Sequence, residues 1–180
     1  MRRRVARSSA GDIAVTSLAF TADGTQLVGI TDQGGAPGNT ILTTVNLQTG
    51  ALTPLSDRAK GYQLFGKLSP DGRHAAFVRD RNLFLSNLDS GREKQLTSDG
   101  APGSIIYGTT DWVYEEEFAL RDGWSWSPDG RYLAFYQFDE SATSDFTMLD
   151  LRGKKPEPIT FRFPLAGEPN SEVRVGVYDV

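Results

Sequence analysis

Short segments of aromatic and aliphatic residues alternate with turn residues along most of the chain, which is typical of strands joined by tight turns. Three of the turns share a sequence: Thr-Ala-Asp-Gly at 21–24, and Ser-Pro-Asp-Gly at 69–72 and 127–130. Pro at the second position, Asp at the third and Gly at the fourth suit a type I turn, which here would join antiparallel neighbours. After each turn we predict a second, a third and a short fourth strand. The second strands are expected at 26–30, 74–78 and 132–137, and the third strands at 41–47, 83–88 and 146–151.

The spacing of these units indicates the fold class. The turn glycines Gly24, Gly72 and Gly130 are 48 and 58 residues apart, close to the repeat of about 40–50 residues found in propeller blades. The sequence therefore predicts an all-β fold, a partial β-propeller with about three four-stranded blades and the start of a fourth. The expected blades are about 13–56, 62–97 and 123–161, with a short helical insertion at 98–122 and the next blade starting at 171–180. Since propellers close with about 4–8 blades and an open arc leaves strand edges unpaired, we expect the chain to be part of a longer protein.

Composition narrows the function classes. With 180 residues, 38% hydrophobic content and a net charge of −4, the chain suits one soluble domain and does not favour a nucleic-acid partner. The absence of cysteine and the single His74 argue against a zinc centre, and we expect neither a metal nor a cofactor. No run approaches the roughly 20 apolar residues of a membrane helix. Residues 1–12 carry four arginines but no apolar run, so we expect a disordered basic stub without a visible signal peptide, and the compartment stays open.

The stretch from Asp111 to Phe118, which reads Asp-Trp-Val-Tyr-Glu-Glu-Glu-Phe, contains the strongest candidate chemistry. On a short helix successive side chains are about 100° apart, so Glu116 and Glu117 can splay over neighbouring faces and close on one cation. The alternative is a solvated helix start, capped by Thr110 or Asp111, because carboxylates in a first turn are favoured electrostatically. Its position in a long excursion from a rigid scaffold favours a binding role.

No catalytic residue is predicted in this chain. A nucleophilic serine of the hydrolase type needs a Gly-x-Ser-x-Gly elbow, which does not occur. The nearest match, around Ser125, runs directly into the third repeated turn, so Ser125 is expected in a strand. His74 is expected to be a surface or packing residue. The acidic segment 139–145 lacks the ligand spacing of a calcium loop and is expected to be a solvated loop.

Residues 106–118 and the segment Trp-Ser-Trp-Ser-Pro-Asp-Gly at 124–130 resemble the N-terminal β-propeller of dipeptidyl peptidase IV-like proteins in the prolyl oligopeptidase (serine peptidase) family. Residues 163–170 resemble the linker that follows, and the similarity covers about 83–180. The resemblance implies an eight-bladed propeller that caps a C-terminal α/β-hydrolase domain, with a Ser-Asp-His triad outside this chain. It also implies that Glu116 and Glu117 bind the N-terminal ammonium of a peptide substrate, supported by Asp111, Trp112, Tyr114 and Glu115.

The resemblance further implies a parent enzyme that releases X-Pro or X-Ala dipeptides, with this fragment inactive alone. Implied partners are peptides with a free N-terminus, the hydrolase domain and a second copy in a homodimer. One departure matters: the family's substrate-contacting arginine should fall near 31–40, where no Arg occurs, so substrate anchoring is expected to differ. Phe163 and Ser171 stand where Tyr and Pro are usual. The competing hypothesis is a non-catalytic propeller that serves as a protein-binding scaffold.

Overall fold

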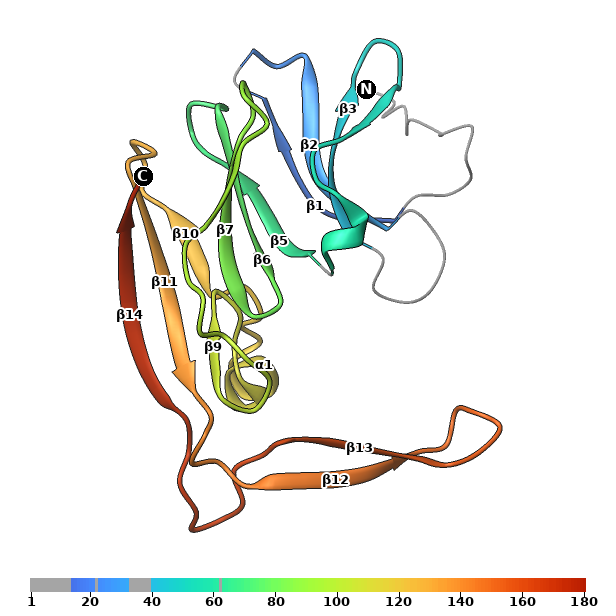
Figure 1. The fold of residues 1–180 in the computed structure, drawn as a ribbon, viewed down its shortest axis with the longest axis vertical. Helices are drawn as coiled ribbons and strands as arrows, with labels where there is room; N and C mark the ends of the chain where they lie inside the picture. Colours follow the sequence, from blue (N-terminus) through green and yellow to red (C-terminus); the bar gives the residue numbers. More distant parts are fainter. Residues whose placement is uncertain (1–13, 22, 33–39, 62) are drawn as a thin grey trace.

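The computed structural model describes residues 14–21, 23–32, 40–61 and 63–180, so the basic segment 1–12 lies outside the described residues. The chain forms antiparallel sheets with one short α-helix (Figure 1), and the predicted all-β class is confirmed. The elements are β1 (Ala14–Phe20), β2 (Gln26–Asp32), β3 (Thr40–Asn46), β4 (Leu52–Pro54), the 3-10 turn η1 (Arg58–Lys60), β5 (Gln63–Leu68), β6 (His74–Arg79), β7 (Asn82–Asn87), β8 (Glu93–Gln95), β9 (Ile105–Tyr107), α1 (Trp112–Phe118), β10 (Trp124–Trp126), β11 (Tyr132–Asp139), β12 (Asp145–Asp150), β13 (Glu157–Arg162) and β14 (Glu172–Asp179).

The first two sheets are meanders, with strand orders β1-β2-β3-β4 and β5-β6-β7-β8. Two hydrophobic clusters hold neighbouring sheets together. Phe77 and Leu42 are fully buried in a cluster shared by the first and second sheets, and Leu83 and Leu133 are fully buried in a cluster shared by the second and third. Successive sheets therefore pack face to face, as propeller blades do. No helix among the described residues is long and apolar enough to cross a membrane.

The three repeated turns have the same hydrogen bonds. In each turn the glycine N–H donates to the first residue's carbonyl at 2.9 Å, the glycine φ is between 68° and 73°, and the first residue's hydroxyl donates to the Asp carboxylate at 2.5 Å. The hydroxyl bond is the main reason that the pKa of Asp71 is lowered. The same bond from Thr21 is the largest cause lowering the pKa of Asp23 to about 2. The turn sequence thus encodes a local structure that is repeated from sheet to sheet.

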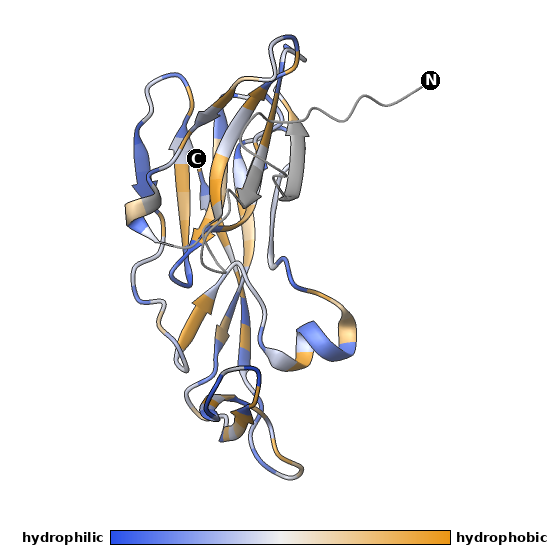
Figure 2. Cartoon of the chain, turned by 90° about the vertical axis from the view of Figure 1, so that its right-hand side faces the viewer, coloured by the Kyte–Doolittle hydropathy of each residue, from blue (hydrophilic) through white to orange (hydrophobic). Residues whose placement is uncertain are grey.

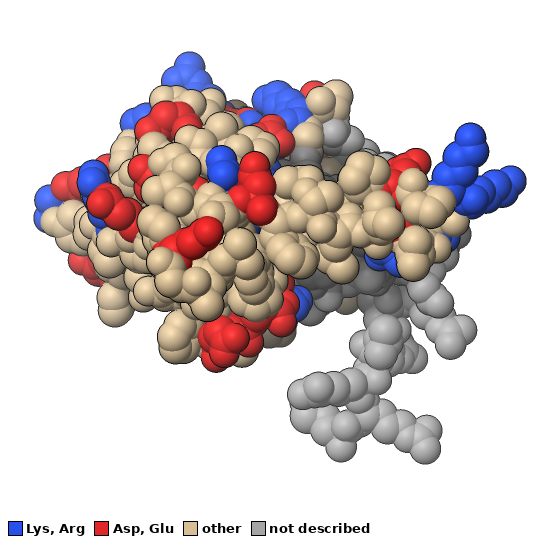
Figure 3. Space-filling model, turned by 90° about the horizontal axis from the view of Figure 1, so that it is seen from below, with Lys and Arg blue, Asp and Glu red and all other residues tan. Residues whose placement is uncertain are grey.

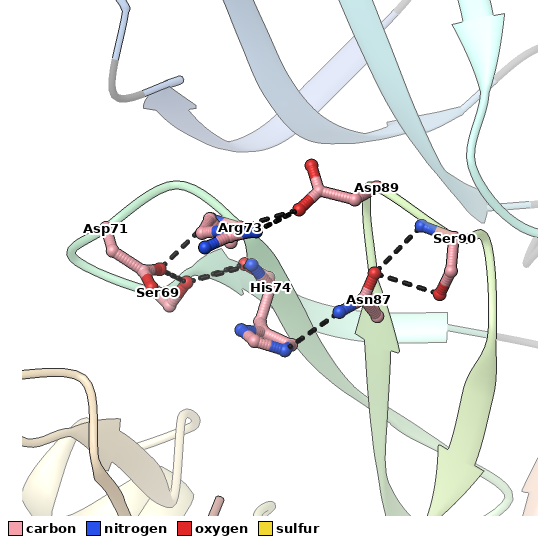
Figure 4. Close-up of polar contacts among 7 residues, drawn as sticks. All are labelled: Ser69, Asp71, Arg73, His74, Asn87, Asp89 and Ser90. Carbon is pink, nitrogen blue, oxygen red and sulfur yellow. Dashed lines mark hydrogen bonds and ion pairs between the residues drawn. The ribbon is translucent and has the colours of Figure 1, made fainter.

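Figure 4 shows how the second turn is tied to its sheet. Arg73 donates twice to Asp89, which lies in the turn between β7 and β8, and this contact raises the pKa of Arg73. The His74 ring lies 3.2 Å from the amide nitrogen of Asn87 on the neighbouring strand. His74 therefore connects β6 to β7, in keeping with the expected packing role.

The third sheet differs from the predicted strand assignment. Its third strand is β14, which pairs with β11 from Tyr132↔Asp179 to Asp139↔Glu172, whereas β12 and β13 pair only with each other. The expected blade at 123–161 and the expected new blade at 171–180 are corrected accordingly: 172–179 completes the third sheet, and 145–162 is a separate hairpin. Sequence alternation could not distinguish two equally strand-like segments. The packing does, because Gly176 lies opposite Phe135 and leaves room for its ring.

The edge strand of the third sheet is interrupted. β9 pairs with one end of β11 and β10 with the other end of the same edge, and the chain leaves the sheet between them to form α1. Gly123 donates to the Gly108 carbonyl at 3.1 Å, so the two ends of the excursion are held together. The expected insertion at 98–122 is therefore partly sheet, because it contains β9. In the view of Figure 2, α1 stands out from the sheets.

Candidate functional site

Helix α1 has defined caps at both ends. Asp111 is 5% exposed, and its side chain accepts a hydrogen bond from the Tyr114 N–H at 3.0 Å. Of the two predicted caps, the structure has Asp111 in this role. At the other end Ala119 takes a left-handed conformation with φ of 53°, and the Leu120 N–H bonds the Tyr114 carbonyl. The caps restrict the helix to the segment that carries the glutamates.

Aromatic side chains anchor the helix. The Trp112 ring lies 4.4 Å, centroid to centroid, from Phe163, which follows β13. Tyr114 packs edge-on against Phe138 of β11 at 4.8 Å. Two of the predicted supporting residues therefore fix α1 against the third sheet and the base of the β12–β13 hairpin. The sequence places them as neighbours of the glutamates, but only the fold reveals what they contact.

The three adjacent glutamates occupy different environments. Glu115 is half-buried and forms an ion pair with Arg121, with 3.0 Å between Oε1 and Nε. Glu116 and Glu117 are exposed, and neither side chain has a hydrogen bond or ion pair with any residue that the structure describes. The four predicted supporting residues thus stabilise the helix, and the carboxylates of Glu116 and Glu117 have no partner among the described residues. The supporting residues are Asp111, Trp112, Tyr114 and Glu115. Whether Glu116 and Glu117 bind an ammonium stays a prediction.

A cavity of about 860 Å³ adjoins the start of α1. It is open to solvent and lies between the β6–β7 turn, the excursion and the base of the β12–β13 hairpin. Its lining comprises Leu64, Val78, Asp80, Arg81, Pro102, Gly103, Ile106, Thr109, Thr110, Asp111, Trp112, Glu115, Glu140, Asp145, Thr160, Phe161 and Arg162. Glu115 lines this cavity, whereas Glu116 and Glu117 do not.

Glu140 is the residue that sequence reasoning missed. The segment 139–145 was expected to be a solvated loop, but Glu140 is only 9% exposed. Burial raises the pKa of Glu140, the Asp111 carboxylate raises it further, and Arg81 and Arg162 oppose these effects. No local pattern signals this environment, because the charged neighbours come from positions far away in the sequence.

The remaining candidates carry no catalytic arrangement. Ser125 lies in β10 opposite Ala134, and its hydroxyl donates to the neighbouring Trp126 carbonyl. Within the described ranges no three His, Cys, Asp or Glu side chains form a group that could hold a metal ion. Most of the arginine-free stretch 31–40 lies outside the described residues.

Residues 23–180 match the family described as "Dipeptidyl peptidase IV (DPP IV) N-terminal region". Among curated proteins, the chain is 36% identical over 149 residues to the probable dipeptidyl-aminopeptidase B of Talaromyces marneffei, covering 75% of this chain and 16% of that protein. It is 32% identical over 143 residues to the probable dipeptidyl peptidase 4 of Arthroderma benhamiae, covering 76% and 18%. The chain thus spans less than a fifth of the length of these relatives.

Among solved structures, the crystal structure of Porphyromonas gingivalis dipeptidyl peptidase 4 matches with a TM-score of 0.77 and 35% identity. The match covers 92% of this chain and 24% of that one. Together with the stacked sheets described above, this match confirms the predicted partial β-propeller.

Proposed function

Because the chain belongs to the family of dipeptidyl peptidase IV N-terminal regions, we propose that it is the substrate-gating propeller portion of a serine dipeptidyl peptidase. In this proposal the whole protein releases X-Pro or X-Ala dipeptides, and its Ser-Asp-His triad lies in a C-terminal α/β-hydrolase domain outside this chain. Glu116 and Glu117 bind the N-terminal ammonium of the peptide.

The observation that carries the proposal is the different use of three adjacent carboxylates. Glu115 is paired with Arg121, while Glu116 and Glu117 are exposed and unpaired among the described residues. The caps and the aromatic contacts of Trp112 and Tyr114 hold the helix in place. Such a helix presents two carboxylates from a fixed backbone, which favours recognition of a small cation.

The energetics are adequate for a selective clamp. A unit charge about 4 Å from an ammonium contributes roughly 4 kcal/mol of gross attraction at an effective dielectric near 20. After desolvation, a hydrogen bond to a charged group nets about 1.5–3 kcal/mol. Fixing the ammonium at a set distance from a nucleophile selects the carbonyl that follows the second residue. Two glutamates on a rigid support would thereby set the length of the released peptide.

The test uses the whole protein with Glu116→Gln, Glu117→Gln and the double variant. Each single change removes one charge at nearly constant size, so we expect kcat/KM for a free-amine substrate to fall roughly 10- to 150-fold. The double variant should lose less than the sum of the two free-energy costs, since both carboxylates contact one nitrogen. Glu172→Gln, at an exposed site on β14, is the matched control and should leave the rate unchanged.

An N-acetylated peptide provides the second control. It lacks the ammonium, so the wild type should cleave it poorly and the glutamine variants should lose nothing further on it. Equal cleavage of blocked and free peptides by the wild type would show that α1 is not an ammonium clamp.

The β12–β13 hairpin favours a second role, that of a protein-binding surface. It extends away from the sheets (Figure 1), and much of its length is free of charged groups in Figure 3. Its exposed apolar side chains are Phe146, Met148, Leu149, Leu151 and Ile159. A two-stranded hairpin is marginally stable alone in water, so we propose that a second copy of the protein covers it in a homodimer. Met148→Ser with Leu149→Ser should then shift the sedimentation of the whole protein from dimer to monomer, and an unchanged dimer would contradict this role.

The non-catalytic scaffold is the alternative to the peptidase. It is distinguished by the complete reading frame: a Gly-x-Ser-x-Gly elbow followed by Asp and His beyond residue 180 favours the enzyme. A frame without these residues favours the scaffold.

A further inference from the structure

Glu140 is a buried carboxylate that lines the cavity beside α1, where Arg81 and Arg162 attract it without contacting it. It is 9% exposed, and no hydrogen bond or ion pair joins its side chain to any residue that the structure describes. Buried charges are normally paired, because removing a carboxylate from water is costly unless an opposite charge or donors compensate. The position of Glu140 on the wall of a cavity therefore points to a ligand that supplies the missing partner.

Four of the other six charged groups on the wall have partners of their own, whereas the side chains of Asp80 and Arg81 have no hydrogen bond or ion pair among the described residues. Asp111 caps the helix, Glu115 pairs with Arg121, and Asp145 pairs with Arg162 at 3.2 Å. Arg162 also donates to the carbonyls of Gly103 and Thr143. The wall carries five carboxylates and two guanidinium groups, so it has an excess of negative charge: Asp80, Asp111, Glu115, Glu140 and Asp145 against Arg81 and Arg162. This excess favours a positively charged occupant.

The rest of the wall is apolar, and part of it is aromatic. The apolar lining residues are Leu64, Val78, Pro102, Ile106, Trp112 and Phe161. A lysine or arginine side chain combines an aliphatic stem with a cationic head, so it can bury its stem on such a wall while its head contacts a carboxylate. Aromatic rings add attraction for a cation that approaches their faces.

We propose that this cavity binds the basic side chain of a peptide, with its ammonium or guanidinium group against Glu140 and its stem along the apolar wall. This site rests on the proposed function only in that the protein handles peptides. Glu116 and Glu117 do not line the cavity, so they leave this site unaffected. Since no group of metal-ligating side chains forms within the described ranges, an organic cation fits the cavity better than a metal ion.

The test is calorimetric titration of the complete gene product with Nα-acetyl-lysine methylamide, whose only charge is the side-chain ammonium. We expect saturable binding, and no binding of the neutral norleucine analogue. Glu140→Gln should weaken the binding of the lysine probe by about 10-fold or more, because the substitution removes the negative charge and keeps a side chain of similar size. Glu172→Gln, on β14 and not on the cavity wall, should bind the probe as the wild type does.

A second variant keeps the test independent of how Glu140→Gln folds. Thr160 is exposed and lines the cavity, so Thr160→Arg should place a guanidinium inside it and abolish binding of the probe. Absence of saturable binding by the wild type would overturn the proposal. Wild-type affinity in Glu140→Gln, or in a Thr160→Arg variant with native melting, would also overturn it.

The dipeptide amide Ala-Pro-NH2 (Ala-Pro below), whose only charge is the α-ammonium, separates this site from the glutamate clamp. Its binding should weaken in Glu116→Gln and stay unchanged in Glu140→Gln. If Glu140→Gln weakens the binding of Ala-Pro as much as the binding of the lysine probe, the cavity does not select a basic side chain and the proposal is wrong. If Glu116→Gln leaves Ala-Pro unaffected while Glu140→Gln still weakens the lysine probe, the clamp fails and the cavity proposal stands.

Discussion

The hairpins β6–β7 and β12–β13 have the same antiparallel geometry and opposite surroundings. In β7 the residues from Asn82 to Ser86 are all buried, whereas in β12 those from Asp145 to Leu149 are all exposed. The difference comes from neighbours: β7 also pairs with β8 and its sheet packs between two others, while β12 and β13 pair only with each other. A strand-like sequence therefore specifies a hairpin, and the partners on each side decide whether the hairpin belongs to a core.

The largest expected effect tests this difference with one residue type in both hairpins. Phe77 of β6 is fully buried and stacks on Phe84 with ring centroids 5.7 Å apart. Phe77→Ala should cost about 3–5 kcal/mol of the free energy of unfolding, because it leaves a cavity between two sheets. Phe146→Ala in the exposed hairpin should cost about 1 kcal/mol, the contribution of its aromatic contacts. Denaturant titration measures both, and equal losses would contradict the comparison.

The next effect concerns the attachment of the exposed hairpin to the rest of the molecule. Arg162 connects the end of β13 to the Gly103 carbonyl at 3.0 Å and to the Thr143 carbonyl at 2.8 Å. Arg162→Ala should cost about 1.5–3 kcal/mol, because hydrogen bonds from a charged group are lost. Arg174→Ala removes an exposed pair with Glu172 and should cost less than about 1 kcal/mol. Thermal unfolding compares the stabilities of the two variants. If Arg162→Ala loses no more stability than Arg174→Ala, other contacts attach the hairpin.

A smaller effect on stability should distinguish β14, which pairs with the third sheet, from the β12–β13 hairpin, which does not. A Cβ added at Gly176 would lie 2.4 Å from the Phe135 ring, so Gly176→Ala should cost about 1–3 kcal/mol through overpacking. A Cβ added at Gly153 would lie 3.3 Å from the Lys155 carbonyl oxygen, but Gly153 is in the exposed bend between β12 and β13, where the backbone can adjust. Gly153→Ala should stay within about 0.5 kcal/mol of the wild type. Similar melting temperatures for the two variants would indicate that β14 is loosely packed.

The smallest effect is a pH dependence at the repeated turns. The pKa of Asp23 in the folded chain is about 2, below the usual 3.8 of an aspartate, chiefly because the Thr21 hydroxyl donates to it. A carboxylate with a lowered folded pKa stabilises the fold above the unfolded pKa, and this stabilisation is lost as the pH falls through the folded value. The contribution should therefore decline between about pH 4 and pH 2. Asp23→Asn should make the melting temperature less dependent on pH over that interval. A variant whose melting temperature falls with pH as steeply as that of the wild type would contradict this prediction.

The turns and the helix could be predicted from sequence because their stabilising contacts are local. Asp71 bonds Ser69 two residues away, and Asp111 bonds the Tyr114 N–H three residues away. The placement of β14 could not be predicted, since it depends on Gly176 meeting Phe135 across a sheet. The burial of Glu140 was missed for the same reason. Long-range packing therefore decided what the local pattern left open.

The site followed the same rule. Glu116 and Glu117 were identified from their own pattern, and their roles stay predictions. The distinction between Glu115 and its neighbours emerged only from the Arg121 contact, which depends on how the chain turns after Ala119.

The interrupted edge of the third sheet has a consequence for protein engineering. β9 and β10 keep their pairing with β11 on both sides of the gap, and the bond from Gly123 to Gly108 closes the gap at its base. The closure entropy of a loop held at its ends grows only slowly with its length. We therefore expect the sheet to keep its register when helices of other lengths and sequences replace the segment 109–122.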